Sequence, residues 1–161
     1  MKHTISVLLQ NKPGALSRVT GLFSGRGFNI ESLAVAPTLE EDVSCLTLVT
    51  VGDNAIIEQI TKQLNKLIDV IKVQDISEKS CVERELVLIR VKAEAGTRAE
   101  VLRIVDIFRA RVVDVSTRSF AVEVTGTGDK IEAMIDLLRP IGIQEVIRTG
   151  TIAMTRAPKK N

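Results

Sequence analysis

Residues 11–38 read NKPGALSRVTGLFSGRGFNIESLAVAPT, and this stretch holds one short amphipathic helix between two turns that contain asparagine. Pro13 and Gly14 end the segment before the helix. The apolar residues that follow recur at the spacing of one helical face: Leu16, Val19, Leu22 and Phe23. The Gly-Arg-Gly turn at 25–27 ends the helix, because glycine tolerates the left-handed backbone found at many helix ends. The other elements of the fold are predicted from the segments on either side of this helix.

The flanking segments give the order strand, helix, strand, strand, helix, strand. Residues 4–10 alternate between apolar and polar, and further strands are predicted at 29–36, 43–51 and 69–76. Asp53 is a suitable N-cap for the second helix. This order predicts an α+β fold of the split β-α-β, or ferredoxin-like, type, with two helices on one face of a four-stranded antiparallel sheet.

The second half of the chain repeats the same pattern. Strands are predicted at 85–93, 111–116, 120–126 and 143–150, with helical apolar stripes at 101–108 and 131–138. A polar link, SEKS at 77–80, separates the two copies. We therefore expect two ferredoxin-like βαββαβ domains, at 1–77 and 78–161, and a disordered tail at 156–161.

Composition argues against nucleic acid and membrane as partners. The net charge is +2, from 22 basic and 20 acidic residues that are interspersed along the chain. Four Phe and no Tyr or Trp are too few for a platform on which bases stack. No apolar run is long enough to span a membrane, and the N-terminus lacks the features of a signal peptide. We expect a cytoplasmic protein.

The sequence also lacks the usual groups of an enzyme. His3 is the single histidine, and we expect it to be solvated beside the N-terminus. No internal imidazole is thus available for a nucleophile and base pair or for a metal site. Neither GxGxxG nor GxxxxGK[ST] occurs. We expect no catalytic residue, no cofactor and no metal on this chain.

The two asparagine turns suggest half-sites for an amino acid. The helix N-terminus at Gly14 offers free backbone N–H groups to a carboxylate. Asn11 and Asn29 can offer side-chain oxygens to an ammonium group if packing, within one chain or across two, brings them together. The apolar side chains for a small pocket would come from nearby residues: Ile30, Leu33 and Val35. The same residues also fit plain turns and core positions, so the residues alone leave both interpretations open.

The segment SVLLQNKPGALSRVTGLFSGRGFNIESLAVAPT, at 6–38, resembles the start of the regulatory subunits of acetohydroxyacid synthase, a family with an ACT domain. The pattern N-x-x-G-x-L-x-R followed by RG(F/Y)NIESL carries the resemblance. It continues through VGDNAIIEQITKQLNKLIDVIKV and into VERELVLIRVKA, at the entry to the second domain. One departure is Gln10, where the family usually has glutamate or a similar residue.

The resemblance implies a non-catalytic homodimer that activates a large catalytic subunit and confers feedback inhibition by valine. Thiamine diphosphate, magnesium and FAD would then belong to the catalytic subunit. The implied effector site joins Asn11, Gly14, Ala15 and Leu16 of one chain to Asn29 and Ile30 of its partner. Nearby residues implied to adjust the site are Ser17, Arg18 and Ala36.

The second domain has no Asn-x-x-Gly turn. We therefore assign it to contact, coupling or dimer support and not to a second effector site. The alternative is an ACT-type amino-acid sensor that serves another enzyme or a transcriptional regulator.

Overall fold

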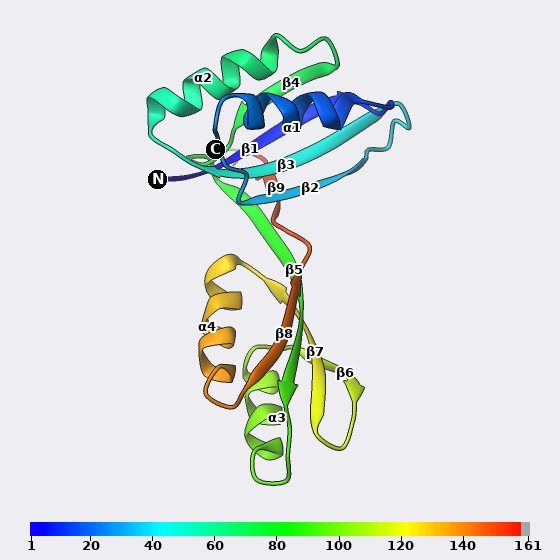
Figure 1. Ribbon diagram of the computed structural model, residues 1–161, viewed down its shortest axis with the longest axis vertical. Coiled ribbons are helices and arrows are strands. Elements are labelled where there is room, and N and C mark those ends of the chain that lie inside the picture. Colours follow the sequence, from blue (N-terminus) through cyan, green and yellow to red (C-terminus); the bar gives the residue numbers. More distant parts are fainter. Residues whose placement is uncertain (159–161) are drawn as a thin grey trace. The chain divides into compact units, whose positions relative to one another are not determined.

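The first half of the computed structural model, which describes residues 1–158, forms the predicted split β-α-β unit (Figure 1). Its elements are β1 (Lys2–Gln10), α1 (Ala15–Gly25), β2 (Ser32–Pro37), β3 (Val43–Val51), α2 (Asn54–Asn65) and β4 (Val70–Asp75). The sheet has the order β2-β3-β1-β4, and every neighbouring pair is antiparallel. Both helices cover one face of this sheet.

Alternation along β1 builds the core of this unit. Ile5, Val7 and Leu9 all point toward the helices and are buried. The helices contribute Phe23 from α1 and Leu64 from α2, both also buried. Asp53 caps α2 as predicted, since its carboxylate accepts a hydrogen bond of 2.8 Å from the backbone N–H of Ile56.

The second half repeats this architecture, as its sequence predicts. Its elements are β5 (Cys81–Lys92), α3 (Arg98–Ile107), β6 (Arg111–Val115), β7 (Ser119–Gly126), α4 (Gly128–Leu138) and β8 (Ile143–Arg148). The strand order is β6-β7-β5-β8, the equivalent of the first sheet. Val87, Ile89 and Val91 of the central strand are fully buried beneath the two helices.

A ninth strand, β9 (Ile152–Thr155), follows the second unit and was not predicted. It pairs with β5. The backbone N–H of Thr151 donates to Ser32 Oγ at 3.1 Å, and the N–H of Arg156 donates to the carbonyl of Ser80 at 2.8 Å. These bonds attach the segment that starts at Thr151 to residues of the first unit.

The unit boundaries therefore differ from the expected division at residue 77. Contacts group residues 1–82 with the segment from Thr151, and they group Glu83–Gly150 separately. The cause is that β5 is one continuous strand whose first residues belong to the first unit. Of the tail expected at 156–161, Arg156 is hydrogen-bonded, and residues 159–161 lie outside the described part of the chain.

His3 is buried, so the expectation that it is solvated is wrong. It is only 3% exposed, and its Nδ1 lies 3.1 Å from Asp75 Oδ2. The sheet begins at Lys2, which pairs with Val51, so position 3 already lies within the sheet on its helix-covered face. Burial acts to raise the pKa of Asp75, but hydrogen bonds from Ser77 and His3 outweigh it and hold that pKa below its ordinary value.

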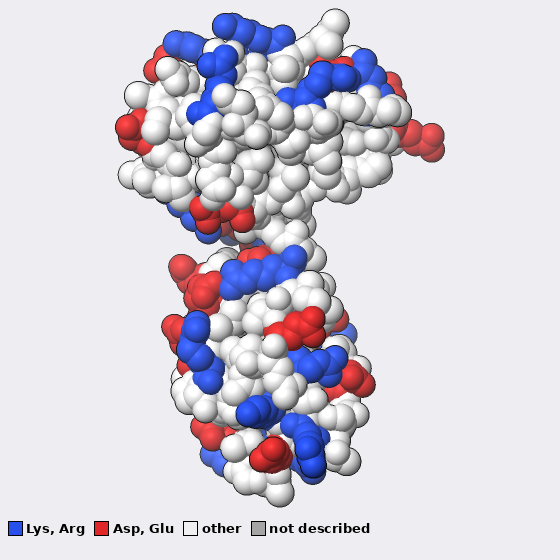
Figure 2. Space-filling view, in the orientation of Figure 1, with Lys and Arg blue, Asp and Glu red and all other residues white. Residues whose placement is uncertain are grey.

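Surface charge is mixed on both units. In Figure 2, basic and acidic side chains are interspersed on the visible face of the second unit, and the first unit also carries both signs. Among residues 1–158, no helix has the length and apolarity needed to cross a bilayer.

Phe23 provides a test of this core. Its ring is 1% exposed and meets Phe28 edge to face at 6.3 Å between centroids. We expect Phe23→Ala to lower the unfolding free energy of the first unit by about 3–5 kcal/mol, measured by urea denaturation followed by circular dichroism. Ser24→Ala, at an exposed position of the same helix, is the control. A loss below about 1 kcal/mol for Phe23→Ala would contradict this packing.

Candidate effector-binding site

The turn between β1 and α1 ends in a glycine whose backbone conformation most side chains disfavour. Gly14 is the N-cap of α1 and has φ +84°, in the left-handed region that side chains disfavour. A Cβ placed there would also lie 2.9 Å from Arg18 Nη1. The N–H of Ala15 donates to the carbonyl of Lys12 at 3.3 Å. No side chain within residues 1–158 caps this helix, so the next two N–H groups, those of Leu16 and Ser17, remain available to an anion.

A buried carboxylate holds this turn in place. Asp69, just before β4, is 1% exposed and receives the Nε–H of Arg18 on one oxygen. Its other oxygen lies 2.8 Å from Lys12 Nζ. The backbone carbonyl of Asp69 also accepts the N–H of Gln10 at 2.8 Å. Asp69 therefore fixes the chain just before the turn and the first turn of the helix that follows it.

The ion triad of Lys12, Arg18 and Asp69 carries a net positive charge. Arg18 and Lys12 contribute two positive charges and Asp69 one negative charge, so the triad carries one net positive charge (2 − 1). The hydrogen bond from Arg18, followed by that from Lys12, lowers the pKa of Asp69 below its ordinary value. α1 has no acidic residue in its first turn. The helix dipole adds a further partial positive charge at the same place.

A pocket of about 240 Å³ opens beside this turn. Its lining comes from the end of β1, the turn, the start of α1, the end of β2 and the start of β3: Leu9, Gln10, Asn11, Lys12, Ala15, Leu16, Val35, Ala36, Pro37 and Ser44. The structure thus brings together five of the residues predicted for the site from sequence: Asn11, Ala15, Leu16, Val35 and Ala36.

The remaining named residues lie next to the pocket or far from it. Gly14 precedes Ala15 directly, although it is not part of the lining. Arg18 sits beneath Gly14 in the Asp69 triad, and Ser17 is an exposed residue of the first helical turn.

Asn29 and Ile30 lie at the opposite end of the same sheet. The N–H of Asn11 bonds to Asp42 just before β3 begins, whereas the carbonyl of Asn29 accepts the hydroxyl of Thr50 near the end of β3, at 2.7 Å. Seven residue steps along β3 separate Val43 from Thr50, which amounts to roughly 23 Å. A single chain therefore does not bring the two asparagines together.

Two of the three apolar residues expected in the pocket belong elsewhere. Ile30 and Leu33 pack against the core of the first unit and do not line the pocket. Val35 does line it and remains 40% exposed. The reason is position along β2, because only the end of this strand lies beside the start of α1.

The residue that orders the site, Asp69, is not evident from the sequence pattern. It stands at the start of a predicted strand, and its ion pairs join positions 51 and 57 residues apart in the chain. One signal was present, namely an aspartate at the entrance to an apolar strand, since a buried carboxylate requires partners. Pro37 and Ser44 were missed as well, because their place in the lining depends on the pairing of β2 with β3.

Family models match both units of the fold. Residues 5–72 match the model described as the AHAS small subunit-like ACT domain, so the first unit is an ACT domain. Residues 84–157 match the model of the small subunit of acetolactate synthase.

Individual relatives extend this match over the whole chain. The chain is 58% identical to the probable acetolactate synthase small subunit of Archaeoglobus fulgidus, over 99% of this chain and 100% of the relative. It is 51% identical to the acetolactate synthase small subunit of Mycolicibacterium smegmatis, over 98% of this chain and 92% of the relative. The chain belongs to the family of acetolactate synthase small subunits.

A solved structure supports the same assignment. The crystal structure of the acetolactate synthase small subunit from Thermotoga maritima is similar with a TM-score of 0.89 and 40% sequence identity, over 99% of each chain. The fold and the family resemblance expected from the sequence are thereby confirmed.

The Asp69 triad predicts a pH-dependent loss of stability. Because the pKa of Asp69 is lower in the folded chain than the unfolded value of ~3.9, its contribution is complete well above that value. It is lost as the pH falls through the folded pKa. We expect Asp69→Asn to destabilise the first unit at pH 7, and the difference from wild type to shrink in acid.

Urea denaturation at a series of pH values measures this difference. Asp106→Asn, at an exposed position of α3, controls for the loss of an unburied carboxylate. A difference between Asp69→Asn and wild type that stays constant from pH 7 into strong acid would contradict the ion-pair account.

Proposed function

We propose that this chain is a regulatory subunit that activates the catalytic subunit of acetolactate synthase and inhibits it when valine binds. The observation that carries the proposal is the uncapped, positively charged N-terminus of α1, which opens onto a small pocket with apolar walls at the free edge of a sheet. In a family of acetolactate synthase small subunits, such a site suits a product of branched-chain amino-acid biosynthesis.

The site complements the parts of a small apolar amino acid. Its carboxylate would meet the first N–H groups of α1 and the positive charge of the triad. Its ammonium group would meet Asn11, whose Nδ2 already donates to the carbonyl of Glu41 at 2.8 Å, leaving Oδ1 as an acceptor. Leu16 and Val35 would contact the side chain. A pocket of about 240 Å³ suits a short side chain.

A homodimer would complete the site. β2 is an edge strand, and it runs from the end of the sheet that carries Asn29 toward the end that carries the pocket. If two copies pair antiparallel through β2, the start of one strand lies beside the end of the other. Asn29 and Ile30 of one chain would then approach Asn11 of the second chain. The exposed side chains of Val35 and Leu39 at this edge would be covered.

Inhibition then follows from differential binding. Valine held by residues of two chains would stabilise one arrangement of the regulatory dimer over others. If the catalytic subunit is most active with a different arrangement, occupancy of the site lowers its activity. The chain itself supplies no catalysis in this proposal. Thiamine diphosphate, magnesium and FAD would act on the catalytic subunit.

Calorimetric titration of the purified chain with valine tests the site. We expect saturable binding for the wild type and its loss in Asn11→Ala, because the ammonium group loses an acceptor. Asn65→Ala is a matched control, since Asn65 is also exposed and its Nδ2 also donates to a backbone carbonyl, that of Thr61 at 3.0 Å. Equal valine affinity in Asn11→Ala and Asn65→Ala would show that the site is misplaced.

Substitution of Gly14 separates inhibition from activation. In Gly14→Asp the new carboxylate would take the place of the effector carboxylate beside Arg18. Aspartate is among the residues that tolerate a positive φ best. We expect the reconstituted enzyme to keep its activation and lose its inhibition by valine, measured as acetolactate formation over a valine titration. Full valine sensitivity in this variant would refute the proposed carboxylate position.

A further inference from the structure

Ser44, the second residue of β3, is a buried polar residue that lines the pocket beside the start of α1. It pairs with Leu9 of β1 and with Pro37 of β2, so its side chain shares the helix-covered face with that of Leu9. The residue is 6% exposed, and within residues 1–158 no hydrogen bond engages its hydroxyl, which is open to the pocket. A buried hydroxyl without a partner is unfavourable, so this one suits a ligand that supplies a hydrogen bond.

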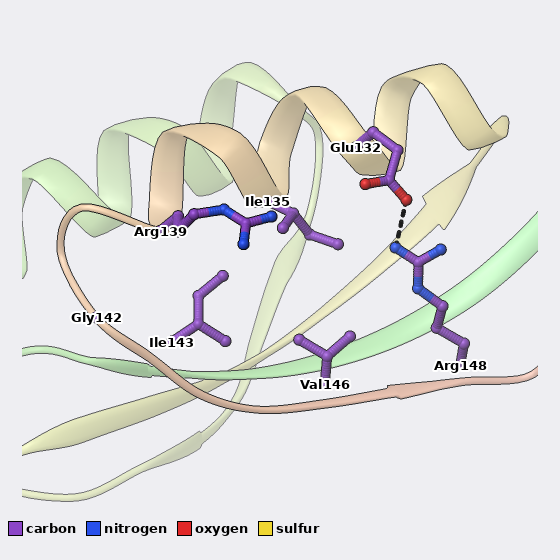
Figure 3. A pocket seen from close by; sticks show the side chains of 7 residues that line it. All are labelled: Glu132, Ile135, Arg139, Gly142, Ile143, Val146 and Arg148. Atoms are coloured by element: carbon purple, nitrogen blue, oxygen red, sulfur yellow. Dashed lines mark hydrogen bonds and ion pairs between the residues drawn. The ribbon is translucent and has the colours of Figure 1, made fainter.

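Polar side chains in another pocket of the chain already have partners. A cleft of about 610 Å³ in the second unit is lined by Glu132 and Arg148, which form an ion pair with 2.5 Å between Oε1 and Nη2 (Figure 3). The other charged residue of this lining, Arg139, lies 3.8 Å from Asp136. The remaining side chains of the cleft in Figure 3 are aliphatic. Each polar side chain that lines this cleft thus has a partner, whereas Ser44 has none within residues 1–158.

The repeat of the fold shows that the position of Ser44 does not require a polar residue. Ser44 pairs with Leu9, the last buried residue of β1, and Phe120 pairs with Val91, the last buried residue of β5. The two positions are therefore equivalent. Phe120 is buried and belongs to the core of the second unit. Because an apolar ring satisfies packing at this position, a ligand explains the serine of the first unit.

Ser44 lies beyond the groups that would hold the ammonium and carboxylate of an amino acid. The N–H of Asn11 donates to the carbonyl of Asp42 at 2.8 Å, so these two residues lie opposite each other. Ser44 is two residues further along β3, roughly 7 Å from Asp42. With the ammonium group at Asn11 and the carboxylate at the start of α1, Ser44 would face the side chain of the ligand.

We propose that Ser44 recognises a hydroxyl group on Cβ of the effector, so that the site binds threonine as well as valine. The inference rests on the proposed function for the site itself. Threonine has the shape of valine with a hydroxyl in place of one methyl group, and so it fits the same pocket of about 240 Å³. Its hydroxyl exchanges a hydrogen bond with that of Ser44, because each group is both a donor and an acceptor.

The hydroxyl of Ser44 changes the balance between these two ligands. An apolar pocket discriminates against threonine by about a hundredfold relative to valine, since the ligand hydroxyl loses its water without a replacement. A hydrogen bond to Ser44 supplies that replacement. Bound valine, in contrast, leaves the hydroxyl of Ser44 unpaired. Ser44 therefore brings the affinities for threonine and valine closer together.

Calorimetric titration of the full-length chain with valine and with threonine tests this role. We expect both to bind the wild type, and threonine to displace valine. Ser44→Ala should weaken threonine binding about fivefold or more and leave valine binding within about twofold, because threonine alone loses a hydrogen bond. Ser6→Ala is the matched control, since Ser6 lies in the same sheet between Ile5 and Val7 and faces away from the helices. It should change both affinities by less than about twofold.

Circular dichroism checks the fold of each variant. Ser44→Ala should unfold at the same urea concentration as wild type, because it removes a hydroxyl that has no partner in the chain. Should it fail to fold, Ser44→Cys gives the same comparison, since a thiol keeps the size of the side chain and is a weak donor.

Threonine that does not displace valine from the wild type would overturn this inference. An equal loss of affinity for both ligands in Ser44→Ala would overturn it too, because the hydroxyl would then contact the ammonium or carboxylate group that the two ligands share. A wild-type chain that binds neither amino acid would instead overturn the proposed function.

Discussion

The carboxylate of Asp69 holds Lys12 and Arg18 on either side of the turn that leads into α1, and the effector site depends on this ion triad. A buried carboxylate is unfavourable unless it is paired, so the triad is under strong constraint to keep its geometry. That geometry places Arg18 beneath Gly14 and leaves a net positive charge at the start of the helix. The free N–H groups of α1 and the charge of the triad then act on the same ligand carboxylate.

Open sheet edges are a second feature that the two units share. Each unit has the same strand order, so each has two outer strands. In the first unit, β2 is the edge next to the pocket, and we assign it to a second copy of the chain. In the second unit, β8 is an edge next to an apolar cleft. Exposed strand edges with apolar side chains are sites where another chain tends to pair, which is why the assignment of β2 has testable consequences for assembly.

Local sequence patterns were sufficient for most of the fold. Alternation in β1 and the helical spacing from Val19 to Phe23 are set by neighbouring residues, so both elements were predicted. β9 was missed, since four residues carry too little pattern and its contacts are to segments far away in the chain. His3 was misjudged because closeness to a terminus says nothing about pairing with β3. For the site, the sequence placed Asn11 in the turn between the first strand and the first helix, where the structure has it, but gave no distance to Asn29, which depends on strand direction. Its pairing with a second chain remains a prediction.

The claim that two chains share each effector site has a direct test in mixed dimers. Asn11→Ala and Asn29→Ala chains are each expected to bind no valine as homodimers, because each removes one side of both sites. When the two variants are unfolded together and refolded as a mixture, about half of the dimers should contain one chain of each kind. Each such dimer keeps one site with both asparagines intact. Calorimetry of the mixture should therefore recover valine binding at about a quarter of the wild-type site number. A mixture that binds no more valine than its parent variants would contradict a site shared between chains.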